Sequence, residues 1–263
     1  MPELPDVEMF KQYFDATSLH QRVDDVDVRN AYILKETSAR ELGRGLKGRS
    51  FESSRRHGKH LFVRADGKLW LRLHFGMTGS LQYFKNDEQA PRHARVVFVF
   101  ANNHRLAFDD QRQFGQISLL RDVDEFMKKR ALGPDALDLE LGEFRKILGK
   151  RRGAVKSILM NQRLIAGIGN IYADEILFRA RMHPATEISR LGDKALTKLF
   201  RAARYILEKA IVAKADVNEM PGSWLLPHRG KGGKCPRCGR KLTSARIGGR
   251  TAWFCAHCQE RVD

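Results

Sequence analysis

The first residues of the chain could supply an unusual nucleophile. The sequence opens Met1-Pro2-Glu3-Leu4-Pro5-Asp6-Val7-Glu8, and an initiator Met before a small residue is normally removed. The exposed secondary amine of Pro2 would titrate near pH ~8, so part of it is neutral at pH 7 and can attack an electrophilic carbon to give an iminium. Glu3 beside it could donate or accept a proton. On these residues alone the simpler alternative is a helix start bracketed by prolines, with Asp6 as its N-cap.

The four cysteines have the spacing of a metal site. Sixteen residues separate the two pairs Cys235-Pro-Arg-Cys238 and Cys255-Ala-His-Cys258. Two such knuckles predict one structural zinc ion with four thiolate ligands and no open position, and strands at 241–243 and 251–254 between them. Iron–sulfur and redox sites are the alternatives. The hairpin would carry Arg246 and Arg250, which could meet a phosphate backbone.

A glycine turn near the middle of the chain suits an anion. Gly167 and Gly169 end one helix, and Asn170 opens the next, whose N-terminal amides favour a phosphate. The alternative is an ordinary corner between helices. Three cations lie just upstream and favour the phosphate interpretation: Arg151, Arg152 and Lys156.

Four residues of the N-terminal half are candidates for reading nucleic acid. Lys59 lies at the start of a predicted strand, and Met77, Arg112 and Phe114 lie in two glycine-flanked turns. A flexible apolar side chain, an arginine and an aromatic ring at loop tips suit insertion into a duplex from which a base has been extruded. Taken singly, Met77 would be a core residue and Phe114 a hairpin hydrophobe.

The composition predicts an anionic partner. The 263 residues carry 48 Lys+Arg against 31 Asp+Glu, a formal charge of +17 that attracts nucleic acid over a long range. Neither an apolar run of transmembrane length nor a basic amphipathic helix with a clean apolar face is present, so we expect no membrane partner. The acidic, proline-containing start is no signal peptide, and we expect a cytoplasmic protein.

These residues must be positioned by two kinds of structure. Val7, Phe10, Tyr13 and Phe14 predict a helix after Pro5. Strand patterns follow over residues 22–120, with hairpin turns at 65–68 and 102–103, and predict a β-sandwich or barrel. Helical patterns dominate after Val123, over 143–148, 155–160, 171–180 and 196–212. The sequence Leu132-Gly-Pro-Asp135 indicates a break, and the composition changes again from Pro221.

Taken together, the motifs resemble the formamidopyrimidine-DNA glycosylase/endonuclease VIII family of base-excision repair enzymes. The resemblance runs essentially end to end. Its elements are Pro2-Glu3-Leu4-Pro5-x-Val7-Glu8, Gly58-Lys59, His74-x-Gly-Met-Thr-Gly79, Asp110-x-Arg-x-Phe-Gly115, Leu132-Gly-Pro134, Ala166 to Glu175, and the zinc ribbon with Arg250.

The resemblance implies a multi-domain α+β fold. It places an N-terminal helix and β-sandwich in residues 1–131, a helical domain with a helix–two-turns–helix motif in 132–220, and a linker with a zinc ribbon in 221–263. It also implies one structural zinc ion and a monomer acting at the nucleoid. The implied partner is double-stranded DNA with damaged bases or abasic sites.

The resemblance also implies roles for individual residues. Pro2 is similar to the nucleophile that attacks C1′ of the damaged nucleotide, and Glu3 to the acid that assists opening of the sugar ring. Lys59 is similar to a lysine that contacts the phosphate beside the lesion. Three residues are similar to a wedge that fills the space left by the damaged nucleotide: Met77, Arg112 and Phe114. Asn170 and Arg250 are similar to residues that clamp the phosphates on either side of it.

Within the family, the motifs resemble the formamidopyrimidine branch, which favours oxidised purines such as 8-oxoguanine and formamidopyrimidines. Two features depart from it. Asp6 replaces a Glu of the opening motif, and residues 213–234 lack the usual run of the lesion-capping lid. The pair His228-Arg229 is closer to the endonuclease VIII branch, which favours oxidised pyrimidines.

We therefore expect a zinc-bearing, bifunctional DNA glycosylase/AP lyase that forms a Schiff base through Pro2 and cuts the strand by β,δ-elimination. The same chemistry on oxidised pyrimidines is the alternative substrate class. Two alternatives come from other classes: a non-catalytic protein that binds damaged DNA, and a zinc-ribbon protein that binds RNA or the ribosome.

Overall fold

The structure of the protein, a computed structural model, describes residues 1–149 and 151–260 and forms two compact units. The first unit contains residues 1–2 and 6–131, and the second contains residues 3–5 and the chain from Leu132 onward. Each unit has its own large hydrophobic core. Among the described residues, no helix is long and apolar enough to cross a membrane.

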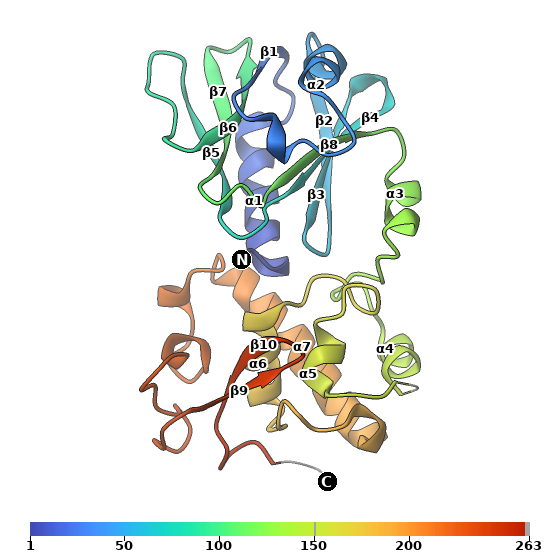
Figure 1. Ribbon diagram of the computed structural model, residues 1–263, viewed down its shortest axis with the longest axis vertical. Coiled ribbons are helices and arrows are strands. Elements are labelled where there is room, and N and C mark those ends of the chain that lie inside the picture. Colours follow the sequence, from blue (N-terminus) through green and yellow to red (C-terminus); the bar gives the residue numbers. More distant parts are fainter. Residues whose placement is uncertain (150, 261–263) are drawn as a thin grey trace. The chain divides into compact units, whose positions relative to one another are not determined.

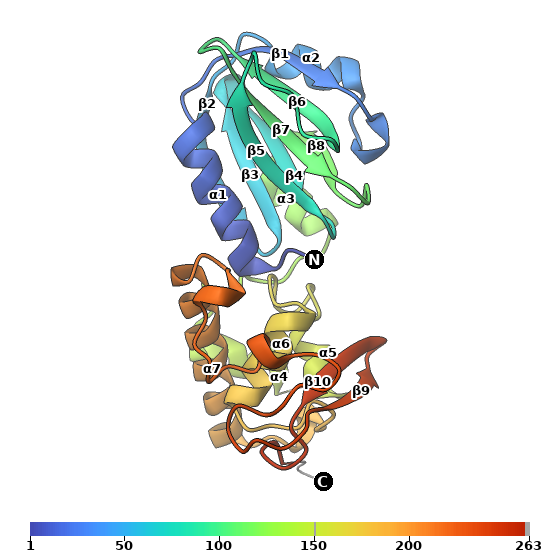
Figure 2. The same ribbon diagram turned by 90° about the vertical axis from the view of Figure 1, so that its left-hand side faces the viewer.

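The first unit is built on two four-stranded antiparallel sheets (Figure 1). One has the order β1-β6-β7-β5 and the other the order β2-β3-β4-β8. The inward side chains of both sheets share one core, which makes the pair a β-sandwich (Figure 2). The strands are β1 Val23–Val28, β2 Phe51–His57, β3 His60–Ala65, β4 Leu69–His74, β5 Gly79–Lys85, β6 Ala94–Phe100, β7 His104–Asp110 and β8 Gln116–Leu120.

Both predicted hairpins are confirmed. Strands β3 and β4 pair around residues 65–68, where Gly67 has a φ of 74° and the one-turn helix η2 (Asp66–Lys68) forms. Strands β6 and β7 pair around Asn102 and Asn103, and Asn103 has a φ of 64°. Asparagine tolerates this left-handed conformation better than most residues, which explains why the turn falls there.

The helices of the first unit include one that the sequence analysis missed. The predicted N-terminal helix is α1, Leu4–Ser18; it begins before Asp6, which lies in the first turn and is not the N-cap. Helix α2, Ala39–Leu46, was not predicted, although Ser38 and Glu41 form the reciprocal capping box that signals a helix start. Helix α3 is Val123–Lys129, and η1 is Ala31–Ile33.

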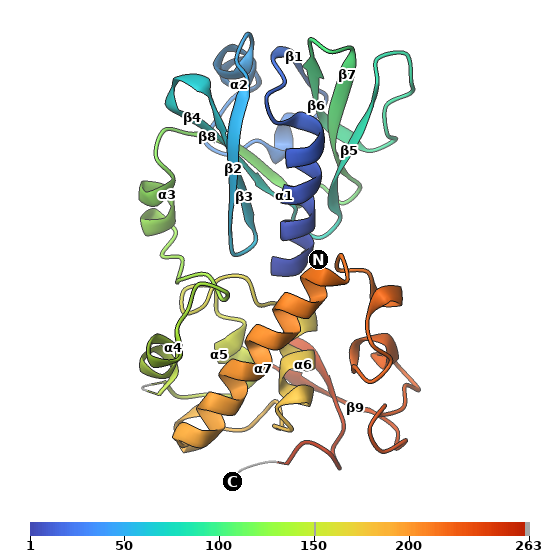
Figure 3. The same cartoon turned by 180° about the vertical axis from the view of Figure 1, so that it is seen from behind.

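The second unit is helical, as predicted after Val123. Helix α7 packs against α6 and α4 around a core of leucine, isoleucine and alanine side chains (Figure 3). The helices are α4 Leu141–Leu148, α5 Val155–Leu159, α6 Asn170–Arg179 and α7 Asp193–Val212, with single turns at η3 Ile188–Arg190, η4 Val217–Glu219 and η5 Leu226–His228.

A two-stranded ribbon follows the helices. Strands β9 (Thr243–Ile247) and β10 (Arg250–Phe254) pair around a Gly248-Gly249 turn with φ values of 55° and 75°. The predicted first strand at 241–243 is wrong, because Leu242 N donates to Gly233 O and belongs to the loop around the first cysteine pair. The fold class is confirmed: an α+β chain with a sandwich, a helical part and a cysteine-bearing ribbon.

Candidate functional site

The carboxylate of Glu3 lies on the N-terminus of helix α6. Glu3 is 1% exposed, and its two oxygens accept hydrogen bonds from Gly169 N at 2.9 Å, Ile171 N at 2.8 Å and Tyr172 N at 3.1 Å. These amides belong to the donors that a helix leaves unpaired at its start, and the positive end of the helix dipole adds to their attraction for a negative charge. Glu3 is therefore held as an acceptor by three donors.

This arrangement corrects one expectation from the sequence. The amides after Gly169 were expected to be available to a phosphate, but Glu3 uses those of Ile171 and Tyr172 as well as that of Gly169 itself. The side chain of Asn170 remains a candidate, because its amide nitrogen could donate to a phosphate oxygen. Its buried Oδ1 is an acceptor and has no hydrogen-bond partner among the described residues. A phosphate at this helix end would thus meet the Asn170 side chain and not a set of open amides.

The backbone next to Glu3 is fixed by a close approach of two chain segments. Leu4 N donates to Gly167 O at 3.1 Å. Gly167 has a φ of +113°, and a Cβ there would lie 2.6 Å from the Leu4 side chain. Only glycine fits this turn, and it allows Leu4 to approach the backbone closely. Pro2 is half-buried and lies two residues before Leu4, and with Met1 in place its nitrogen is an amide.

Lys59 lies in the tight turn between β2 and β3, not within a strand, and is buried. The strands beside it carry a buried cationic cluster on their outer face. Arg72 donates to His60 Nδ1, Ser118 Oγ and Gln116 Oε1, and stacks 4.6 Å from the Phe126 ring.

Burial lowers the pKa of His74 to about 4, with Arg72 and Lys59 adding repulsion. The neutral His74 ring accepts a hydrogen bond from Gly76 N at 3.2 Å through Nδ1. The bond links this sheet to the turn that carries Met77.

Met77, Arg112 and Phe114 lie on two turns of the first unit that are joined to each other. The Thr78 hydroxyl donates to Asp110 Oδ1 at 2.5 Å and accepts from Arg112 N at 3.1 Å, while Gly115 N donates to Asp110 Oδ2 at 2.7 Å. Asp110 is completely buried. The two turns therefore form one rigid tip, with Thr78 and Asp110 at its centre.

The side chains of this tip face solvent. Met77 is 39% exposed and Phe114 is 50% exposed, so the interpretation of Met77 as a core residue is wrong. The Arg112 guanidinium lies 5.1 Å from the Phe114 ring centroid, which keeps the two side chains together. An exposed apolar pair beside an arginine is costly in water, and this arrangement suits a surface that is covered when a partner binds.

Arg250 is positioned by a buried charge network on α6. Asp174 and Lys156 form an ion pair at 2.7 Å, and both side chains are fully buried. Asp174 Oδ2 also accepts from Trp253 N and Arg229 Nε, and Lys156 Nζ donates to Thr251 O. Strand β10, which carries the exposed Arg250, is thereby tied to α6.

The network also overturns the expected role of Lys156. The sequence suggested that Lys156 adds charge for a phosphate, but its ammonium is enclosed between α6 and β10. Burial lowers the pKa of Lys156 and raises that of Asp174, while their mutual attraction opposes both changes. Lys156 is a structural cation in this chain.

Residues 213–234, which replace the expected lid, form a segment anchored around Trp224 and Leu225 that we call the strap. The Glu175 carboxylate accepts from Leu225 N at 3.1 Å and Leu226 N at 2.8 Å, and burial raises its pKa to about 7. Trp224 and Leu225 are buried. The second residue of the His228-Arg229 pair binds Asp174, so it serves the strap itself.

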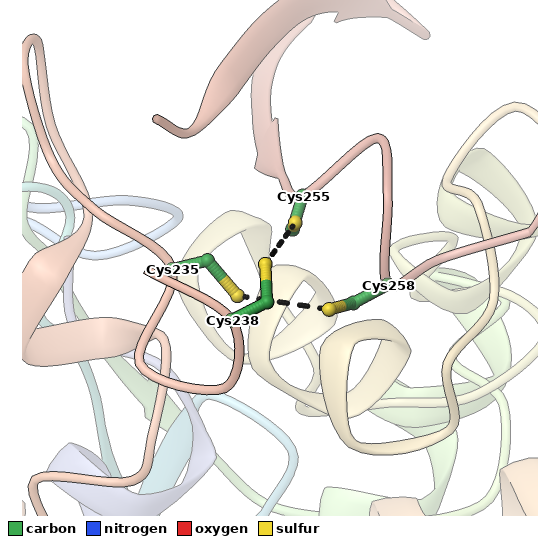
Figure 4. A group of neighbouring side chains, drawn as sticks. All are labelled: Cys235, Cys238, Cys255 and Cys258. Atoms are coloured by element: carbon green, nitrogen blue, oxygen red, sulfur yellow. Dashed lines mark hydrogen bonds between the residues drawn. The ribbon is translucent and has the colours of Figure 1, made fainter. Parts of the chain in front are cut away.

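The four cysteine sulfurs converge at one point (Figure 4). Their Sγ atoms all lie within 4.8 Å of one another, with 3.9 Å between Cys235 and Cys258 and 3.6 Å between Cys238 and Cys255. Zn–S bonds of about 2.3 Å in a tetrahedron require S–S edges of about 3.8 Å. The donor set therefore fits one four-coordinate structural zinc ion.

Four positioning residues were missed by the sequence analysis: Thr78, Asp110, Asp174 and Glu175. Each was within a quoted motif, but motif spacing does not show which polar side chain will be buried. A signal was available for Asp110 only, because a carboxylate directly before a glycine-containing turn commonly accepts from that turn's amides.

Family models match the chain along most of its length. Residues 1–117 match the formamidopyrimidine-DNA glycosylase N-terminal domain, residues 132–220 match the H2TH domain of the same enzyme, and residues 232–261 match a zinc finger found in FPG and IleRS.

Individual relatives are similar over the whole chain. Proteins described as formamidopyrimidine-DNA glycosylase from Solibacter usitatus and Pelotomaculum thermopropionicum are 34% and 32% identical, over 99% of this chain and at least 99% of theirs. A structure of Lactococcus lactis Fpg with abasic-site DNA has a TM-score of 0.88 at 27% identity, over 98% of this chain and 100% of that one. A complex of the same enzyme with N7-benzyl-Fapy-dG DNA has a TM-score of 0.88 at 28% identity, over 99% and 100%.

The geometry of the exposed tip predicts a specific loss on Thr78→Val. Valine keeps the shape but removes the donor to buried Asp110 and the acceptor for Arg112 N, so the free energy of unfolding should fall by about 1–3 kcal/mol. Thr78→Ser keeps the hydroxyl and is the matched control. Urea unfolding checks the pair, and equal stability of the two variants would contradict the assigned role.

Glu175 predicts a pH dependence of stability. Its pKa is about 7 in the folded chain and 4.5 ordinarily, so the folded state holds the proton more tightly and stability falls as pH rises from about 4.5 through 7. Between pH 5 and pH 8 this carboxyl should remove about 2–3 kcal/mol. In Glu175→Gln this contribution to the slope of the unfolding free energy against pH should vanish, whatever the absolute stability of the variant. Urea unfolding at both pH values measures it, and an unchanged slope in the variant would refute it.

Proposed function

Because the chain belongs to the formamidopyrimidine-DNA glycosylase family, it is a DNA glycosylase/AP lyase of base-excision repair, and we propose that it acts on oxidised purines. The observation that carries the proposal is the Glu3 carboxylate on α6, which fixes the residue beside Pro2. Relatives bound to abasic-site and Fapy-dG DNA support the substrate class. The zinc ion is structural, since its four ligands leave no open position.

Pro2 is the proposed nucleophile, once Met1 has been removed. Its secondary amine attacks C1′ of the damaged nucleotide, the base leaves, and an iminium links the enzyme to the opened sugar. The iminium acidifies the C2′ proton, and β- and then δ-elimination cut the strand. Glu3 takes the proton that the Pro2 nitrogen loses and gives it to the ring oxygen, and in this way assists ring opening as an acid. Its three amide donors hold the carboxyl group in place, so that little reorganisation accompanies the proton transfer.

The remaining site residues are proposed to hold the DNA. Lys59 contacts the phosphate beside the lesion, and Asn170 and Arg250 clamp phosphates on either side of the flipped nucleotide. Met77, Arg112 and Phe114 fill the space left by that nucleotide, with Arg112 towards the orphaned base. Support comes from the exposure of Met77 and Phe114, the place of Asn170 at the start of α6 and the ribbon position of Arg250.

Each of three consecutive parts of the chain has its own proposed role. Residues 1–131 carry the nucleophile and the wedge, residues 132–220 the helical grip on DNA, and residues 221–263 the strap and the zinc ribbon. We propose that the protein works as a monomer at the nucleoid in the cytoplasm.

Oxidised pyrimidines are the alternative substrates. The sequence of the strap favours them, because it departs from that of the lid in the formamidopyrimidine branch. The strap is also anchored by Glu175. The tip motifs favour purines, and we give them more weight because their side chains are exposed to a partner.

Borohydride trapping on an abasic-site duplex tests the nucleophile. The protein with Met1 removed, verified by mass spectrometry, should give a covalent adduct that maps to the N-terminal peptide. An otherwise identical chain with a blocked N-terminal extension should give none, because its Pro2 nitrogen is an amide. A full-strength adduct in the blocked chain would assign the chemistry to a lysine instead.

A panel of duplexes with one lesion each tests the substrate class. We expect kcat/KM for 8-oxoguanine and formamidopyrimidine duplexes to exceed that for oxidised-pyrimidine duplexes by about tenfold or more. The abasic-site duplex is the internal control, since it needs no base recognition. A reversed order, with abasic cleavage intact, would establish the pyrimidine alternative without touching the nucleophile.

A further inference from the structure

A basic hollow of about 620 Å³ lies on the second unit, between the C-terminal end of α6, the first turns of α7 and helix α4. Its polar lining is nearly all cationic. Five cations and one carboxylate line it: Arg145 from α4, Arg179 from α6, and Lys194, Lys198, Arg201 and Asp193 from α7.

These cations are poorly neutralised. Arg145 donates to Thr197 Oγ1 at 2.6 Å, lies 3.8 Å from Asp193 Oδ2, and has a buried Nε without a hydrogen-bond partner. Across residues 1–149 and 151–260, the structure gives the other four cations no ion pair. The hollow therefore carries an excess of about four positive charges at pH 7. A cation at the C-terminal end of α6 is stabilised by the helix dipole, which explains the presence of Arg179 but not of the other cations.

The arrangement of the cations indicates the shape of the anion that would bind. Lys194, Lys198 and Arg201 follow one stripe of α7 and span seven residues, about 10 Å along the helix. Measured along the duplex axis, where one strand advances about 3.4 Å for each phosphate, that length corresponds to about three phosphates. A row of separate cations suits an extended chain of phosphates better than one small anion.

The aromatic residue of the hollow is already covered. The Arg179 guanidinium lies 3.4 Å from the Tyr205 ring centroid, stacked on the face that a base would need. The stack also holds the planar guanidinium in place, which suits bidentate binding of phosphate oxygens. The lining therefore favours a backbone over a base, and recognition without sequence preference.

The hollow is separate from the phosphate clamp assigned to Asn170. Arg179 and Asn170 are the last and first residues of α6, nine residues and about 14 Å apart along its axis. The two ends of one helix thus present two different anion-binding surfaces.

We propose that this hollow binds the phosphate backbone of a second, undamaged segment of duplex DNA while the enzyme holds its lesion. The interaction is electrostatic and sequence-independent. Such an interaction would let the enzyme pass between DNA segments during its search.

The test uses the full-length zinc-bound protein saturated with a short duplex that carries a tetrahydrofuran abasic analogue. A labelled undamaged duplex is then titrated against this complex at several salt concentrations, with fluorescence anisotropy as the readout. We expect the second duplex to bind, and Lys194→Gln/Lys198→Gln/Arg201→Gln to weaken that binding by about tenfold or more. The slope of log K against log salt should become shallower by about 0.9 for each phosphate that is no longer neutralised. Cleavage of a separate short duplex with a natural abasic site should stay within about twofold, because these residues lie outside the proposed site.

Arg40→Gln/Arg44→Gln/Lys209→Gln is the matched control, since it removes the same charge from exposed helical positions outside the hollow. Failure of the loaded complex to bind a second duplex would overturn the proposal, and so would equal losses in the two triple variants. A competition arm uses inorganic tripolyphosphate. Displacement of the duplex at matched phosphate concentration would show that a small polyphosphate is the occupant, which also overturns it.

Discussion

The carboxylate of Glu3 on the N-terminus of α6 is the interaction on which the rest of the second unit's functional geometry depends. It fixes the residue next to Pro2 through three amide donors at the start of α6. One turn further along, Asp174 holds strand β10 of the ribbon and Glu175 holds the strap. A single ten-residue helix thus orders the neighbour of the proposed nucleophile, the ribbon with Arg250 and the segment in place of the lid.

Three buried carboxylates around one short helix would be unfavourable without hydrogen-bonding or charged partners. Each of the three has a different kind of partner. Glu3 has the helix amides, Asp174 has the cations Lys156 and Arg229, and Glu175 has two strap amides but no cation close enough for an ion pair among the described residues. That difference explains why burial raises the pKa of Glu175 to about 7. Buried ion pairs add little net stability, so we attribute to them the unique placement of the ribbon and the strap.

The sequence predicted what local patterns control. Alternation and turn residues located the β3–β4 and β6–β7 hairpins, helical periodicity located α1 and α4 to α7, and the paired CxxC spacing located the zinc ligands. It could not show that Glu3 would take the amides expected for a phosphate, since those groups are 166 residues or more apart in the chain. The prediction that Lys156 favours a phosphate was wrong for the same reason, because its burial depends on Thr251, in another element. The shifted β9 reflects loop hydrogen bonds around Cys235 that no periodicity encodes.

The anchored strap also constrains how a lesion can be selected. A lid that closes over a base must leave its resting position, and for this strap that position includes two amide bonds to Glu175 and the buried side chain of Trp224. Exposing one large apolar side chain and breaking two hydrogen bonds costs on the order of 3–6 kcal/mol. Lesion binding would have to supply that energy before any capping interaction formed. Selection by the exposed tip needs no such rearrangement, because the Thr78–Asp110 bond already holds Met77, Arg112 and Phe114 in place. Preorganised side chains at a rigid tip can therefore make their proposed contact with the orphaned base at little conformational cost.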